Sequence, residues 1–437
     1  MLEEQNPWWR GRECIEEDED YRKWSSAKLK WIPSLFYEIK LEPFSLNFVF
    51  GPRQVGKSTL IKLLIKKLLD DGVEPKAVFY YRCDELSDYK ELGEVIDEYL
   101  KFRRGVRTSY IFLDEATMPR EWYRAIKLRI DMGLFRGDVL TLTGSLSMYV
   151  KREVETFPGR RGKGGDYVMY PLSFREFLKV RSPDIFKAIK PLDLGSITLD
   201  RLSRPWRREV QEAFVDYLKC GGFPLSVRSY LEDGRISEEV TRAYLSWIIG
   251  DIAKLGKSEL LVKRILKAVI EKAPSALSWH SLAKELDVGS HRTVFQYVDL
   301  LEKLYIAKVL HFYDPSSGSF VFRKEKKVHV TDPFLYYVLS RWCLTSRPQD
   351  PVLAESVAAS HLARLYDVGY WRNGSEVDIV VDLGREALGF EVKYGKRPKL
   401  SKLIVGKMRR LFNLTLETFS ESPPAAPLSL FLAHLHV

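Results

Sequence analysis

One short stretch of this chain limits its fold more than any other. Residues 51–58 read Gly-Pro-Arg-Gln-Val-Gly-Lys-Ser and fit the pattern G-x-x-x-x-G-K-[ST] in full. An apolar run at 46–50 precedes the stretch, and a helical pattern follows it to residue 69. Strand, glycine loop and helix N-terminus together form a phosphate cradle, because backbone N–H groups and the positive end of the helix face the anion. The sequence therefore predicts a phosphate-binding loop rather than a chance glycine turn.

The residues of this loop have separate expected tasks. Lys57 is expected to reach the β- and γ-phosphates of a nucleotide, and the Ser58 hydroxyl to bind Mg²⁺. ATP and Mg²⁺ are therefore the expected cofactors. The full set expected to hold them is Gly51, Pro52, Arg53, Gln54, Val55, Gly56, Lys57, Ser58, Thr59 and Asp114.

The sequence around the loop alternates between strand and helix patterns. Apolar runs fall at 46–50, 77–82, 109–113 and 139–143, with helical patterns at 57–69, 89–103 and 120–132. Strands that alternate with helices are typical of a parallel sheet covered by helices. We therefore expect an α/β fold for residues 45–170.

Polar residues follow the third and fourth apolar runs. Asp114 and Glu115 end the third run, 57 positions after Lys57 (114 − 57). An aspartate there is placed to hold Mg²⁺ through water, and the glutamate to orient the attacking water. The fourth run ends at Ser145, the expected γ-phosphate sensor, with Thr143 as second choice. An ordinary polar strand end is the alternative.

Residues 157–165 form a basic, glycine-rich stretch that contains Arg160 and Arg161. Such a loop can deliver an arginine to the γ-phosphate on a neighbouring subunit. It can also contact DNA phosphates or lie in solvent, and the residue types do not decide between these three. Upstream, Trp8, Trp9 and Trp31 either pack on the core or lie against an adenine ring.

Composition excludes several classes of protein. The chain has 437 residues, which suggests two to four domains at about 150 residues each. No apolar run approaches the ~18 residues of a membrane span, and the N-terminus lacks the pattern of a signal peptide. Four scattered cysteines fit a reducing cytoplasm. The net charge of +10 permits contact with nucleic acid, and the scarcity of Asn and Gln is typical of thermophiles.

The middle of the chain is expected to be helical. Residues 171–255 read as a helical segment, and 259–312 as a winged helix with helices at 260–272, 279–286 and 290–304. The third of these helices begins with His291 and Arg292 and carries Gln296, which are side chains that suit a groove-reading helix. Winged helices also serve as plain packing modules, so both roles stay open.

The last informative feature is a predicted hairpin. Residues 375–382 and 388–394 alternate as half-buried strands around a turn. In this hairpin, the residue numbers of two residues that face each other across the strands add up to 769. Asp378 then lies opposite Glu391, with Lys393 on the same face. Directly opposed like charges are unfavourable, so a divalent metal is a natural candidate to offset them. Glu355 could complete that metal site, which could activate water against a phosphodiester. The alternative is an exposed charged face with Lys393 as ion-pair partner.

Together these motifs resemble the archaeal AAA+-type P-loop ATPase family. The resemblance lies in GPRQVGKST, IFLDEA, LTGS, PGR, PLSFREF and GGFP. The part that carries Asp378, Glu391 and Lys393, with Glu355 as first acid, is similar to the PD-(D/E)xK nuclease-like fold. The resemblance implies Ser145 as sensor and Arg160 as the arginine finger. It also implies an N-terminal extension (1–44), an ATPase core (45–170), a helical lid (171–255), a winged helix (256–325) and a nuclease-like domain (326–437).

Three functions remain open at this point. The first is a DNA-processing ATPase that acts as a homo-oligomer and carries a Mg²⁺-dependent nuclease. The second is an ATP-controlled binding switch whose nuclease-like part is an inactive interaction module. The third is a chaperone-like ATPase that acts on proteins.

Overall fold

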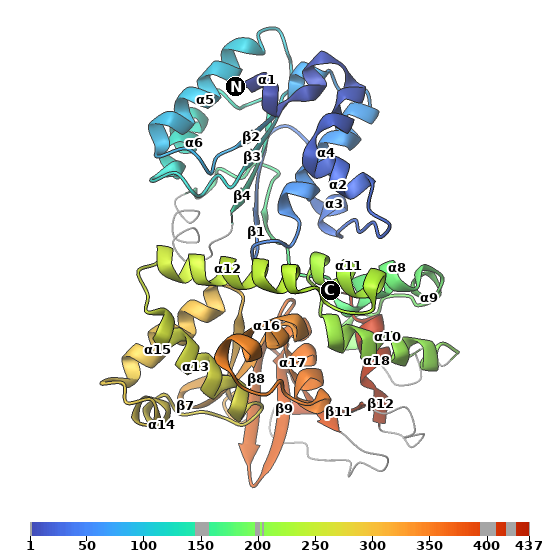
Figure 1. Cartoon of the computed structure of the whole chain (residues 1–437), viewed down its shortest axis with the longest axis vertical. Coiled ribbons are helices and arrows are strands. Elements are labelled where there is room, and N and C mark those ends of the chain that lie inside the picture. The colour runs from blue at the N-terminus through green and yellow to red at the C-terminus, as the bar shows by residue number, and fades with distance from the viewer. Residues whose placement is uncertain are drawn as a thin grey trace. The chain divides into compact units, whose positions relative to one another are not determined.

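The computed structural model describes residues 2–144, 157–196, 202, 205–393, 408–416 and 425–436. The chain forms two compact units, Met1–Pro171 (unit 1) and Leu172–Val437 (unit 2), and each is described by itself (Figure 1). Ser145, the expected sensor, lies outside the described residues. Within the ranges above, no helix is both long and apolar enough to cross a membrane.

Unit 1 is built on a parallel five-stranded sheet in the order β2-β3-β4-β1-β5. Its strands are β1 (Ser45–Phe50), β2 (Val78–Arg82), β3 (Tyr110–Asp114), β4 (Val139–Gly144) and β5 (Asp166–Val168). Figure 1 shows α5 (Tyr89–Phe102) and α6 (Trp122–Asp131) on one side of the sheet and α4 (Lys57–Asp70) on the other. The helix-covered parallel sheet is thus confirmed. The sequence analysis missed β5, because this short edge strand is largely exposed and lacks an apolar run.

The N-terminal segment covers the outer edge of β2. It comprises α1 (Leu2–Gln5), η1 (Pro7–Arg10), η2 (Arg12–Glu17), α2 (Glu19–Ser25) and α3 (Leu35–Glu38). The Asn6 amide donates to the Tyr80 carbonyl at 2.9 Å and accepts from the Tyr80 N–H at 2.7 Å. The indole N–H groups of Trp8 and Trp9 both donate to the Val78 carbonyl at 2.9 Å. These side chains therefore form hydrogen bonds with backbone groups of β2 that would otherwise be unpaired at the edge of the sheet. Trp8 and Trp9 thus pack on the core.

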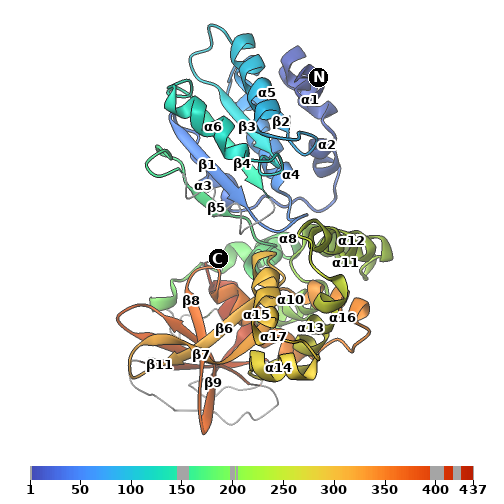
Figure 2. The ribbon, with the colours of Figure 1, turned by 90° about the vertical axis from the view of Figure 1, so that its left-hand side faces the viewer.

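Helices form much of unit 2. They are α8 (Phe174–Arg181), α9 (Pro183–Ala188), α10 (Arg207–Cys220), α11 (Pro224–Asp233), α12 (Glu238–Lys254), α13 (Glu259–Lys272), α14 (Trp279–Glu285), α15 (His291–Lys303), α16 (Pro333–Cys343), α17 (Asp350–Leu362) and α18 (Leu428–His434). Three of them, α13 to α15, match the helices predicted in the segment 260–304. Figure 2 shows these three gathered beside β6 and β7.

A mixed seven-stranded sheet runs through unit 2 in the order β12-β11-β10-β9-β8-β6-β7. Its strands are β6 (Ala307–Asp314), β7 (Ser319–Val330), β8 (Asp367–Asn373), β9 (Ser375–Asp382), β10 (Ala387–Lys393), β11 (Met408–Thr415) and β12 (Ala425–Pro427). The boundary expected after residue 325 falls inside β7. The two strands that follow α15 therefore share one sheet with the C-terminal hairpin.

Two contacts fix how this sheet is assembled. Gly369 of β8 lies against β6, where an added Cβ would come within 2.4 Å of the His311 carbonyl oxygen, so only glycine fits. Before α14, Leu277 pairs with Lys326 of β7 through backbone bonds of 2.7 and 2.9 Å. The predicted hairpin register is also confirmed. In each observed β9–β10 pair, such as Phe390 with Ile379, the two residue numbers add up to 769.

The cover over β2 generates a stability prediction. Changing Asn6→Ala removes both bonds to Tyr80 and leaves two backbone groups without partners, so we expect a loss of about 2–4 kcal/mol in unfolding free energy. Urea denaturation followed by tryptophan fluorescence measures it. Gln5→Ala is the matched control, because its partner, the Arg82 N–H, lies at an exposed position that water can reach. Equal losses in the two variants would contradict the assigned role of Asn6.

Candidate functional site

The predicted phosphate loop connects β1 to α4 in a conformation that needs its glycines. Gly51 has φ 152°, and a Cβ there would lie 2.2 Å from the Met169 carbonyl oxygen. Gly56 has φ 96°, in the left-handed region that glycine adopts without strain. Lys57 and Ser58 then occupy the first turn of α4, where the positive end of the helix dipole lies.

The side chain of Lys57 is turned under the loop. Its Nζ donates to the carbonyl oxygens of Gly51 at 3.1 Å and Pro52 at 2.9 Å, and the residue is buried. Both acceptors are neutral, and a charged phosphate is a stronger partner for an ammonium group. The loop and its lysine therefore fit a phosphate group, and Ser58 supplies a hydroxyl that suits Mg²⁺.

The expected acidic pair lies at the end of β3, where Thr143 of β4 connects its two members. The Thr143 hydroxyl donates to Asp114 Oδ1 at 2.5 Å and accepts from the Glu115 N–H at 3.0 Å. The Tyr80 hydroxyl donates to Asp114 Oδ2 at 3.0 Å. Burial, and next the charge of Asp114, raise the pKa of Tyr80, so the phenol stays protonated as a donor. Both oxygens of the fully buried Asp114 are thus held in place.

Glu115 has an unusual local conformation. Its φ of 50° is left-handed, which is uncommon for a residue with a side chain. Its Oε2 atom is buried and has no hydrogen-bond partner among the residues that the structure describes. A carboxylate oxygen without a partner is one that can accept a proton from water.

Lys62 is a residue of this region that the sequence analysis missed. It lies on α4 and is almost fully buried, with Nζ 2.9 Å from Asp18 Oδ2 and 3.0 Å from the centroid of the Tyr80 ring. Burial lowers the pKa of Lys62, and the charge of Asp18 opposes that shift. The ion pair ties the N-terminal segment to the tyrosine that holds Asp114. A lysine inside an otherwise apolar helical stripe was the available signal.

The structure distinguishes between the two arginines of the basic stretch. Arg161 lies over the ring of Phe48 at 4.5 Å and pairs with Asp166 at 2.8 Å, so it holds the sheet together. Arg160 is partly exposed and pairs with Asp131 at 2.7 Å. The stretch packs closely on β1, because a Cβ added at Gly164 would lie only 2.2 Å from the Leu46 carbonyl oxygen. It is therefore not a free loop.

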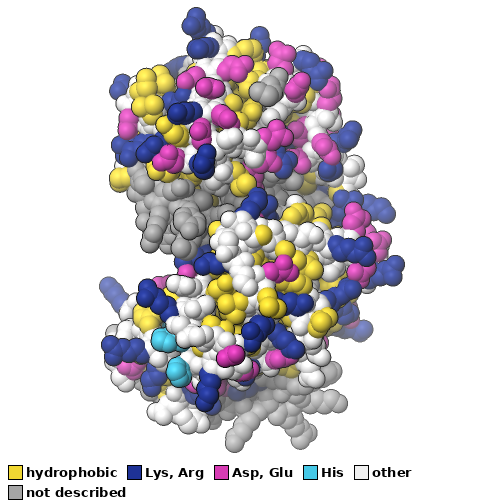
Figure 3. Space-filling model, turned by 60° about the vertical axis from the view of Figure 1, so that its left-hand side comes forward, with side chains coloured by type: hydrophobic (Ala, Val, Ile, Leu, Met, Phe, Trp, Pro, Cys, Tyr) yellow, Lys and Arg dark blue, Asp and Glu magenta, His cyan; other side chains and the backbone are white. Residues whose placement is uncertain are grey.

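A second surface of interest lies on α15 and β7. His291, Arg292 and Gln296 are exposed on α15. Figure 3 shows a pair of His side chains near Lys and Arg on this face, in agreement with the 6.3 Å between the His280 and His291 ring centroids. The β6–β7 ladder jumps from His311–Lys326 to Phe312–Val321, so the exposed residues 322–325, which include Arg323 and Lys324, stand outside it.

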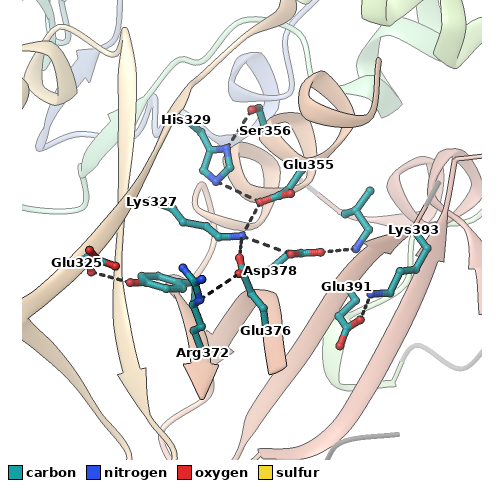
Figure 4. Close-up of polar contacts among 12 residues, drawn as sticks. Glu325, Lys327, His329, Glu355, Ser356, Arg372, Glu376, Asp378, Glu391 and Lys393 are labelled. Carbon is teal, nitrogen blue, oxygen red and sulfur yellow. Dashed lines mark hydrogen bonds and ion pairs between the residues drawn. The ribbon is translucent and has the colours of Figure 1, made fainter. Parts of the chain in front are cut away.

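The predicted C-terminal cluster forms only in part, and a lysine lies at its centre (Figure 4). Glu355 of α17 and Asp378 of β9 come together as predicted. Between them lies Lys327 of β7, with Nζ 2.9 Å from Glu355 Oε1, 3.3 Å from Asp378 Oδ1 and 2.5 Å from Glu376 Oε1. Lys327 was not predicted, because β7 reads as a basic, exposed strand. Glu376 was also missed, although it lies on β9 two positions before Asp378 and therefore on the same face of the strand.

The other two predicted residues form a separate pair. Glu391 is buried and makes an ion pair with Lys393. Asp378 does not share a cation with Glu391; instead its Oδ2 accepts from the Val392 N–H at 2.9 Å. Within the described parts of the chain, no group of three or more His, Cys, Asp or Glu side chains is placed to hold a metal ion. The predicted metal at Glu355, Asp378 and Glu391 is therefore not supported, because lysines offset the carboxylate charges.

The charges of the cluster shift the protonation of its members. Burial, and next the charge of Asp378, raise the pKa of Glu355. Burial alone would lower the pKa of Lys327, but the charges of Glu355, Asp378 and Glu376 outweigh burial and raise it. Burial and then Lys327 lower the pKa of His329 to about 3. Lys327 is thus a permanent cation and His329 a neutral ring at physiological pH.

Comparisons with known proteins identify part of this architecture. Residues 44–178 match the family model of the AAA domain, and residues 211–345 match that of a domain of unknown function (DUF8612). Each match spans less than half of the chain. No curated protein matches it.

Several solved structures share a distant likeness with the chain. The ORC2 protein of Aeropyrum pernix has 13% identity and a TM-score of 0.37, over 77% of this chain and 94% of that one. The ORC1 protein of Aeropyrum pernix in complex with DNA has 15% identity and a TM-score of 0.33, over 80% and 98%. RuvB of Thermotoga maritima has 15% identity and a TM-score of 0.27, over 70% and 89%. TM-scores this low carry no argument about this chain, so the AAA match is the comparison that bears on the site.

The bridge between the acidic residues generates a prediction for nucleotide hydrolysis. Changing Thr143→Val removes the hydroxyl that joins Asp114 to Glu115, so we expect ATP hydrolysis to fall by about 10- to 100-fold. Thr143→Ser keeps the hydroxyl and should stay near the native rate. Steady-state phosphate release measures both variants. A valine variant as active as the serine variant would show that the bridge has no role.

Proposed function

We propose that the chain binds and hydrolyses ATP and uses this reaction to control its binding to DNA. The observation that supports the proposal most is the placement of Asp114 and Glu115 at the end of β3, where Thr143 joins them. Thr143 belongs to β4, which lies between β3 and β1, the strand that leads into the phosphate loop. The match of residues 44–178 to the AAA domain supports the same chemistry.

In the proposed reaction, Lys57 leaves the carbonyls of its own loop and binds the β- and γ-phosphates. Ser58 and Asp114 are the residues that would hold Mg²⁺, which neutralises phosphate charge when bound. Glu115 accepts a proton from water as the water oxygen attacks the γ-phosphorus. The bond to the β–γ bridging oxygen breaks, ADP and phosphate leave, and the proton passes from Glu115 to solvent.

We also propose that the site is shared between subunits of a homo-oligomer. Arg160 is the candidate for the residue supplied in trans, because Arg161 is committed to Phe48 and Asp166. In the single chain, Asp131 neutralises Arg160, and their hydrogen bond lowers the pKa of Asp131. A neighbour's γ-phosphate would compete with Asp131 for this arginine, which would couple assembly to nucleotide state.

The proposed DNA surface comprises α13 to α15 with β6 and β7, which we interpret as a winged helix. The order of three helices and two antiparallel strands supports this, as does the short Leu277–Lys326 bridge. Exposed Arg292, Arg323 and Lys324 can contact phosphates, while His291 and Gln296 can reach base edges. We further propose that α8 to α12 are the helical lid segment of the ATPase.

The organisation of the C-terminal cluster favours the binding switch over the nuclease. Lys327 and Lys393 already engage the carboxylates that a hydrolytic metal would need. We therefore propose that the part around β8 to β12 is a recognition module, and that ATP hydrolysis alone supplies the catalysis of this chain.

The base assignment is tested by Glu115→Gln. The variant should bind ATP normally but hydrolyse it at least ~100-fold more slowly, because an amide cannot accept the proton. Fluorescent-nucleotide binding and phosphate release give the two readouts. Glu121→Gln, a nearby exposed residue, is the matched control. A Glu115→Gln variant that hydrolyses ATP at the native rate would exclude Glu115 as the base.

The DNA surface is tested by Arg292→Ala and Lys324→Ala. Each should weaken duplex binding and reduce the slope of log affinity against log salt by roughly one. Arg208→Ala, exposed on α10, should leave both quantities unchanged. Fluorescence anisotropy between low and physiological salt measures them. Affinity that does not vary with salt would contradict DNA binding through this surface.

A further inference from the structure

We propose that Lys327 takes the place of a metal ion in unit 2, so that the carboxylate cluster is complete without a divalent cation. The proposal concerns the β7–β9–α17 cluster alone and does not rest on the nucleotide chemistry. It goes beyond the absence of a nuclease, because it assigns the cation position to a named side chain and predicts what removing that side chain creates.

The geometry around the ammonium group carries the inference. A lysine ammonium has three N–H donors and no acceptor. The Nζ of Lys327 meets three carboxylates, at 2.9 Å for Glu355, 2.5 Å for Glu376 and 3.3 Å for Asp378. Carboxylates from a helix and a strand converge on one point, as they do around a hard cation. Figure 4 shows the ammonium at that point.

Burial shows that this lysine is a permanent part of the cluster. The side chain of Lys327 is 1% exposed and that of Glu355 is 8% exposed. The backbone of Lys327 is fixed by pairing with Leu310 of β6, and its Nζ lies 5.9 Å from the centroid of the Tyr370 ring. An unpaired buried charge is strongly destabilising, so the lysine and its carboxylates each require the other.

The imidazole ring of His329 lies beside this cluster. His329 Nδ1 contacts the Ser356 hydroxyl at 3.0 Å, whereas its buried Nε2 has no hydrogen-bond partner among the residues described and lies 3.7 Å from Glu355 Oε1. Without the Lys327 ammonium, the cavity would present three carboxylates and a neutral imidazole. Oxygen and imidazole donors together suit a divalent transition metal such as Mn²⁺.

The test is a gain of metal binding in the full chain. Lys327→Met replaces the ammonium with an apolar group, and Lys327→Gln keeps polarity but removes the charge. In nucleotide-free protein stripped of metal, each variant should bind one more Mn²⁺ per chain than the native protein, counted by electron paramagnetic resonance. Mn²⁺ should also raise their unfolding temperature by roughly 5 °C more than it raises that of the native protein.

Two matched variants assign the gained site to this cluster. Adding Asp378→Asn to Lys327→Met should abolish the additional Mn²⁺ and its stabilisation. Lys393→Met, which removes the neighbouring lysine but leaves Lys327 in place, should gain no site. Any Mn²⁺ bound weakly at the phosphate loop is common to all of these proteins and cancels in the comparison.

Three outcomes would overturn the proposal. The first is a native protein that binds Mn²⁺ at a site lost in Asp378→Asn, since a metal would then be resident beside Lys327. The second is a pair of folded Lys327 variants that gain no Mn²⁺. The third is Mg²⁺-dependent cleavage of duplex DNA that Asp378→Asn removes. A Lys327 variant that folds only when Mn²⁺ is present would support the proposal.

Discussion

The position of β4 between β1 and β3 is the constraint on which the candidate ATPase site depends. Parallel strands end at the same edge of a sheet, so this order brings the phosphate loop after β1 near Asp114 and Glu115 after β3. Thr143 at the end of β4 then bonds to both acidic residues. Residues far apart in sequence form one site because the strand order places them there.

Buried lysines determine much of the remaining organisation. Lys62 joins the N-terminal segment to α4 and lies against Tyr80, which in turn holds Asp114. Lys327 joins β7 to α17 and β9 in the same way. In each place the charge is tolerated because acidic partners lie within contact distance, and removing one partner would leave a buried charge uncompensated. These lysines therefore specify which segments pack together, and Lys327 also decides what chemistry its cluster can perform.

The sequence predicted local features well and long-range ones poorly. The phosphate loop, the parallel sheet, the three helices near 260–304 and the hairpin register all follow from periodicity and turn residues, which act over short separations. Tyr80 and Thr143 as partners of Asp114 depend on strand order, which periodicity does not reveal. The predicted metal between Asp378 and Glu391 is not supported, because each carboxylate is paired with a different lysine. Lys327, the cation beside Asp378, lies 51 positions before it (378 − 327), and no local pattern connects the two.

In the proposed function, nucleotide hydrolysis and DNA binding belong to one cycle. The most direct measurement is the rate of Mg²⁺-dependent ATP hydrolysis by the full chain, with and without duplex DNA, at low and high salt. We predict measurable hydrolysis that duplex DNA stimulates severalfold at low salt, with the stimulation lost at high salt. A rate that DNA does not change at any salt concentration, or an absence of hydrolysis in both conditions, would contradict the proposed function.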